Sequence, residues 1–119
     1  MSGLTKKTLM PKVTETTLEI NLASLKHNFK YLKSKLKNHS LFLAVVKAFA
    51  YGNDAIVVAK HLEKLGVDYF AVAYVSEGIA LRKEGITTPI LVLHPQINNL
   101  SLAIEHCLEP SLYTLKILY

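Results

Sequence analysis

A single amine stands at the end of a short apolar run, residues 41–48 (LFLAVVKA). If this run forms a strand, Leu43, Val45 and Lys47 share one face, because successive side chains point to opposite sides. Lys47 then lies at the carboxyl end of the strand, where α/β proteins place their sites. Loss of hydration favours the neutral amine, which attacks carbonyl carbons. The simpler alternative is a lysine whose head only reaches water.

The residues after Lys47, AFAYG from Ala48 to Gly52, combine small side chains with aromatic ones. Small residues allow a ligand to approach the backbone, and the hydroxyl of Tyr51 could donate to an anion. On composition alone, a tyrosine that only packs is the more common case. Neither a P-loop nor a dinucleotide-binding fingerprint is present.

Strand and helix patterns alternate on both sides of Lys47. Apolar runs predict strands at 17–22, 41–48, 69–75, 90–93 and 111–114, and helical spacing predicts helices at 24–36, 54–65, 76–84 and 99–107. Ser24, Asp54 and Ser76 are the predicted helix starts, and Gly66 and Gly85 the predicted stops. The last four strands read as buried on both faces, so we expect parallel neighbours in chain order. The fold class is α/β, and periodicity does not decide between an open doubly wound sheet and a barrel.

Composition narrows the function classes. The chain has 119 residues, half of them hydrophobic, which suits one domain, with residues 1–15 predicted to be a tail. The net charge of +5 comes from lysines without interleaved arginines, which argues against nucleic-acid binding. A lone cysteine, Cys107, favours a reducing, cytoplasmic location. We expect no membrane span, and no metal site because the histidines lack ligand spacing, although His94 ends a predicted strand.

The segment Ala44 to Gly52 (AVVKAFAYG) resembles the cofactor-lysine motif of alanine racemases, AVVKANAYGHG. The opening strand (EINL, 19–22), the next barrel strand (FAVA, 70–73), the stretch from Glu77 to Ile86, and PILVL (89–93) continue the similarity in register. Three departures are Phe49 for the usual Asn, Asn53-Asp54 for His-Gly, and His94-Pro95 where glycine is common. Phe49 matches a Bacteroidetes-type variant of the motif.

The resemblance implies a (β/α)8 TIM-type barrel (PLP fold type III) followed by a β-domain, with residues 16–119 as the N-terminal portion of the barrel. Lys47 would hold pyridoxal 5'-phosphate as a Schiff base, Tyr51 would lie near the phosphate, and Leu93 would line the pocket by the ring. The implied activity interconverts L-alanine and D-alanine for peptidoglycan synthesis. The family's second base, a tyrosine, comes from the partner subunit of a homodimer.

Two alternatives accompany this interpretation. A PLP-binding carrier of the same barrel type would hold the cofactor without turnover, but its lysine motif lacks the continuation seen at Ala50-Tyr51-Gly52. The chain could also be only a folding or interaction fragment. Its apolar end, residues 115–119, is read as a cut through a larger fold. We expect such a fragment to be inactive alone and to self-associate through open strand edges.

Overall fold

The computed structural model describes residues 16–118. The predicted tail, residues 1–15, lies outside them. Four strands form one parallel sheet in the order β1-β2-β3-β4, and the strands are Leu43–Val45, Tyr69–Val72, Ile90–Val92 and Glu109–Pro110. The predicted parallel neighbours in chain order are confirmed.

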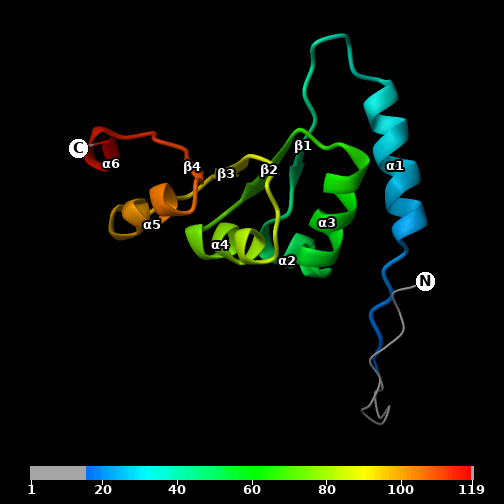
Figure 1. The fold of residues 1–119 in the computed structure, drawn as a ribbon, viewed down its shortest axis with the longest axis horizontal. Helices are drawn as coiled ribbons and strands as arrows, with labels where there is room; N and C mark the ends of the chain where they lie inside the picture. The colour runs from blue at the N-terminus through cyan, green and yellow to red at the C-terminus, as the bar shows by residue number, and fades with distance from the viewer. Residues whose placement is uncertain (1–15, 119) are drawn as a thin grey trace.

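The helices follow the same order along the sheet (Figure 1). They are α1 (Leu22–Ser34), α2 (Lys47–Gly52), α3 (Ala55–Leu65), α4 (Val75–Lys83), α5 (Leu100–Glu105) and α6 (Leu115–Leu118), with a 3-10 turn, η1 (Ile97–Asn99), before α5. Because every right-handed crossover steps to the next strand in one direction, the connecting helices cover the same face of the sheet. A doubly wound sheet needs a reversal of strand order, which these four strands lack. This arrangement favours the barrel type.

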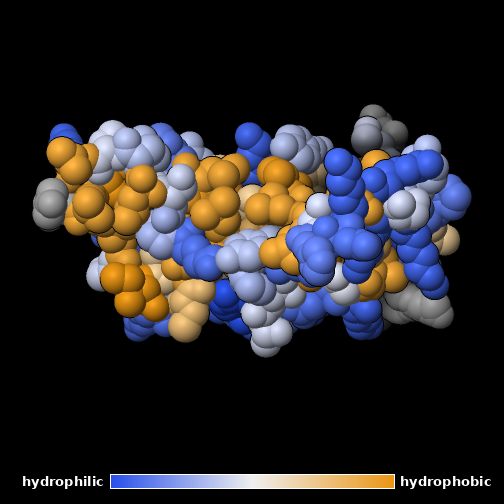
Figure 2. Space-filling model, turned by 90° about the horizontal axis from the view of Figure 1, so that it is seen from above, coloured by the Kyte–Doolittle hydropathy of each residue, from blue (hydrophilic) through white to orange (hydrophobic). Residues whose placement is uncertain are grey.

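Burial separates the two faces of the sheet. Phe70, Val72, Ile90 and Val92 point toward the helices and are fully buried. On the other face Leu43 and its neighbours are open, and exposed apolar side chains gather along one side of the molecule (Figure 2). The prediction that β1 is buried on both faces is therefore wrong, since no helix within residues 16–118 covers its second face.

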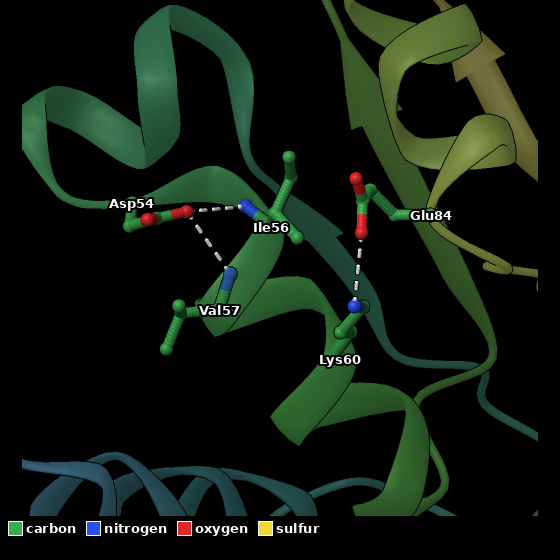
Figure 3. A network of polar contacts seen from close by, with 5 residues as sticks. All are labelled: Asp54, Ile56, Val57, Lys60 and Glu84. Carbon is green, nitrogen blue, oxygen red and sulfur yellow. Dashed lines mark hydrogen bonds and ion pairs between the residues drawn. The ribbon is translucent and has the colours of Figure 1, made fainter. Parts of the chain in front are cut away.

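Local sequence signals set several boundaries as predicted. The Asp54 carboxylate caps α3 by accepting from the backbone N–H groups of Ile56 and Val57, 3.0 and 3.1 Å away (Figure 3). Gly66 ends the helix at φ +94°, a left-handed conformation that costs glycine little. Behind the sheet, α1 packs on α3, and the rings of Phe29 and Phe42 lie 4.8 Å apart.

Other predicted boundaries are wrong. Residues 17–22 form no strand: residues 16–21 lie outside the sheet, and Leu22 begins α1 with Asn21, not Ser24, as its cap. A strand forms only where a neighbouring strand takes up its backbone hydrogen bonds. The fourth strand lies at Glu109–Pro110 instead of 111–114, because β3 ends at Val92 and the last hydrogen bond to it comes from the Ser111 N–H, at 2.9 Å.

Candidate active site

Lys47 lies where the sheet ends and the chain turns. β1 stops at Val45, Val46 still donates to the Ala71 carbonyl at 2.9 Å, and Lys47 begins α2. Its side chain is half-buried. Lys47 thus lies at the carboxyl edge of the sheet, as predicted. The predicted strand 41–48 is too long, because β1 ends at Val45, two residues before Lys47.

The turn after Lys47 is left-handed. From Ala48 to Tyr51 every φ lies between 51° and 59° and every ψ between 42° and 51°. This conformation costs an L-residue about 1 to 2 kcal/mol, so four in succession need support from their surroundings. Ala50 provides such support, because its side chain is buried and both of its backbone groups are hydrogen-bonded. Its N–H donates to the Val46 carbonyl at 3.0 Å, and its carbonyl accepts from the Asn53 side-chain amide at 2.9 Å.

Tyr51 and Leu93, the other two predicted site residues, lie at the same edge of the sheet. Tyr51 occupies the left-handed turn and leaves 65% of its side chain exposed. Leu93 follows β3, donates to the Val72 carbonyl at 2.8 Å and is partly exposed on the uncovered face. The structure places all three at the carboxyl edge, but Lys47 and Tyr51 follow β1 whereas Leu93 follows β3, so β2 lies between the two segments.

A carboxylate supports this edge. Glu77 Oε1 accepts from the backbone N–H groups of Ala73 and Tyr74 at 2.8 and 2.9 Å. Its Oε2 accepts from the N–H of Ala48, the residue after Lys47, at 2.7 Å. Glu77 was not among the predicted site residues, although a glutamate at the third position of a helix is the usual partner of the capping residue.

Comparison with known proteins decides the family. The family described as alanine racemase, N-terminal domain, matches residues 20–119. The chain belongs to this alanine racemase family. The alanine racemase of Citrifermentans bemidjiense is 51% identical over 78 residues, which are 66% of this chain and 21% of that protein. Alanine racemase 1 of Caldanaerobacter subterraneus subsp. tengcongensis is 40% identical over 105 residues, 87% of this chain and 27% of that protein.

Solved alanine racemase structures share the fold. The enzyme of Clostridium difficile 630 superposes with a TM-score of 0.79 at 42% identity, covering 82% of this chain and 26% of that one. The alanine racemase from E. faecalis gives a TM-score of 0.79 at 32% identity, covering 83% of this chain and 27% of that one. The chain therefore spans between a fifth and about a quarter of its relatives, and its four strands are the N-terminal portion of their barrel-type fold.

His94 follows β3 at the carboxyl edge of the sheet and belongs to a group of aromatic side chains. Its Nδ1 lies 3.2 Å from the Tyr113 hydroxyl, the two rings are stacked, and the Tyr74 ring meets His94 edge-on at 5.8 Å. Across residues 16–118 no cluster of three or more His, Cys, Asp or Glu side chains could hold a metal ion. Nor is any helix of that range long and apolar enough to cross a membrane.

Proposed function

We propose that this chain contributes the cofactor lysine and the first part of the barrel to an alanine racemase that interconverts L-alanine and D-alanine. One observation carries the proposal: Lys47 stands at the carboxyl edge of a parallel sheet, immediately before a left-handed turn, in a chain whose family match covers it. Residues 16–119 would be the N-terminal portion of the barrel domain. The D-alanine would serve peptidoglycan synthesis.

The residues present fit pyridoxal 5'-phosphate. The cofactor's aldehyde needs a primary amine, and Lys47 offers one on a half-buried residue at the carboxyl edge of the sheet. Its ring needs an apolar wall, which Leu93 supplies with a partly exposed side chain. Its phosphate needs hydrogen-bond donors, and the exposed hydroxyl of Tyr51 is one. The chain therefore offers one suitable side chain each for the cofactor's aldehyde, ring and phosphate.

Each of these three residues would have a distinct role in the reaction. Lys47 Nζ would bind the cofactor covalently at its aldehyde carbon and, once released, would take or return the Cα proton on one face of alanine. When bound, pyridoxal phosphate withdraws electrons from the amino acid and makes that Cα proton acidic. Tyr51 would anchor the phosphate, and Leu93 would orient the ring and exclude water from it.

Inversion at Cα needs a second proton carrier on the opposite face, because an amine on one face cannot deliver a proton to the other. We assign this role to a tyrosine of the partner subunit, outside this chain, in a homodimer. The whole activity therefore depends on parts of the protein beyond residues 16–118. The cytoplasmic location inferred from the single cysteine stays a prediction.

The test uses the full-length protein that carries this chain. Borohydride reduction in the presence of pyridoxal phosphate should fix the cofactor to the peptide that contains Lys47, and a coupled assay should detect D-alanine. Lys47→Ala should lose both signals, whereas Lys64→Ala, an exposed lysine of α3, should keep both. Labelling at another lysine would refute the assignment. Labelling at Lys47 without racemisation would favour the carrier alternative.

A further inference from the structure

Glu77 joins two segments that are far apart in the sequence. Both oxygens of its half-buried carboxylate are used: Oε1 holds the Ala73 and Tyr74 N–H groups at the start of α4, and Oε2 holds the Ala48 N–H. The contact to Ala48 spans 29 residues of sequence and is the shortest of the three, at 2.7 Å. A helix cap alone would need only Oε1.

The position of Ala48 gives this contact its meaning. Ala48 is bonded directly to Lys47 and is the first residue with left-handed dihedral angles, at φ 51° and ψ 51°. Hydrogen bonds to an ionised acceptor are about twice as strong as neutral ones, so the carboxylate can hold the peptide unit between Lys47 and Ala48 in this costly conformation. That peptide unit fixes the direction in which the Lys47 side chain leaves the backbone.

We propose that Glu77 is a positioning residue for Lys47: it fixes the Lys47–Ala48 peptide unit through Oε2, while Oε1 caps α4. The inference rests on the proposed function of Lys47 as the cofactor lysine. Glu77 lies in the first turn of α4, which follows β2, so the segment after the neighbouring strand holds Lys47, which follows β1.

Glu77→Gln separates the two roles, because glutamine keeps the volume but replaces one of the two acceptor oxygens with an NH₂ group, which only donates. The one remaining oxygen can accept from two N–H groups, of Ala73 and Tyr74, or from one, of Ala48. The side that offers two hydrogen bonds is favoured, so we expect the cap of α4 to be retained. The glutamine NH₂ then faces the Ala48 N–H, and two donors cannot pair. Glu77→Ala removes both roles. Glu84→Gln is the matched control, since Glu84 follows the same helix and meets only Lys60, at 3.1 Å (Figure 3).

The first measurement is amide hydrogen exchange over residues 46–53 in the full-length protein, followed without reference to activity. Loss of a charge-assisted hydrogen bond predicts that exchange at Ala48 becomes at least about tenfold faster in Glu77→Gln and in Glu77→Ala. Thermal stability should stay near the wild-type value in Glu77→Gln and fall in Glu77→Ala. Glu84→Gln should change neither quantity.

The second measurement is kinetic. Glu77→Gln should lower kcat for alanine racemisation at least about tenfold with little change in KM, and should speed release of pyridoxal phosphate, because a misdirected amine affects the chemical step rather than substrate capture. Unchanged exchange at Ala48, or faster exchange with unchanged kcat and cofactor release, would overturn the proposal. So would unfolding of Glu77→Gln, which would make the carboxylate a support of the whole sheet.

Failure of the proposed function would look different. In that case the wild-type protein itself would show neither labelling at Lys47 nor D-alanine, and the kinetic comparison would lose its reference. The exchange comparison between Glu77→Gln and Glu84→Gln would still show whether the carboxylate holds the left-handed turn. The two ideas are therefore tested by separate readouts.

Discussion

The Tyr69 hydroxyl and the Glu109 carboxylate are joined across the uncovered face of the sheet, at 2.8 Å to Oε1 and 2.6 Å to Oε2. Tyr69 lies on β2 and Glu109 on β4, so the contact bridges over β3. It is a polar link on a face that otherwise carries apolar side chains, and it ties the short fourth strand to the centre of the sheet.

The first prediction concerns ionisation of Tyr69. The hydrogen bond to Glu109, with smaller effects of burial and of the negative charge, raises the pKa of Tyr69. A group whose pKa is raised by folding contributes stability below its unfolded pKa and loses that contribution as pH rises through the folded value. Absorbance titration near 295 nm should show one tyrosine that ionises above the ordinary range, and Glu109→Gln should lower its midpoint. An unchanged midpoint would contradict the contact.

The second prediction concerns acid stability. Burial raises the pKa of Glu63, but hydrogen bonds from the backbone and hydroxyl groups of Thr88 and Thr87 outweigh it, so the pKa lies below the ordinary value. A lowered pKa contributes stability above the unfolded pKa, and that stability is lost as pH falls through the folded value. Urea unfolding of wild type and Glu63→Gln should therefore differ at neutral pH and converge in acid. Parallel pH profiles would be the opposite result.

The third prediction concerns Arg82, whose guanidinium donates to four backbone carbonyls. The acceptors are those of Ile86, Thr88, His106 and Cys107, at 2.8 to 3.0 Å. Lysine lacks the planar fork and cannot reach all four, so Arg82→Lys should lower the free energy of unfolding by about 2 kcal/mol or more. Urea denaturation measures the loss. Lys83→Ala, at the next and exposed position of α4, should change it by less than about 0.5 kcal/mol.

The fourth prediction concerns Phe49, which holds a left-handed conformation at φ 55° and leaves 77% of its side chain exposed. Asparagine tolerates this conformation better than phenylalanine, and little packing is lost. Phe49→Asn should therefore raise the free energy of unfolding by about 0.5 to 1 kcal/mol. Phe49→Ala should bring no such gain, because alanine has no local hydrogen bond to offer. Equal destabilisation by both changes would show that the ring packs more than its exposure indicates.

Local signals in the sequence determined the parts of this protein that depend on near neighbours along the chain. Asp54 and Gly66 bound α3 as predicted, because a carboxylate cap and a left-handed glycine act within a few residues. The alternation of apolar runs and helical spacing fixed a parallel sheet in chain order. The motif around Lys47 indicated the family, because a family motif consists of residue types and their spacing, which the sequence contains without coordinates.

Tertiary structure alone decided what depends on contacts between distant segments. The left-handed turn after Lys47 has no glycine in its four strained residues, and its support includes a carboxylate 29 residues away. Residues 17–22 alternate like a strand but form none, because a strand exists only when a partner takes its hydrogen bonds, and Leu22 already begins α1. β1 reads as buried on both faces, yet one face is open, because burial depends on which elements fold over it. Periodicity records a preference for burial, and only the assembled fold supplies the neighbour that satisfies it.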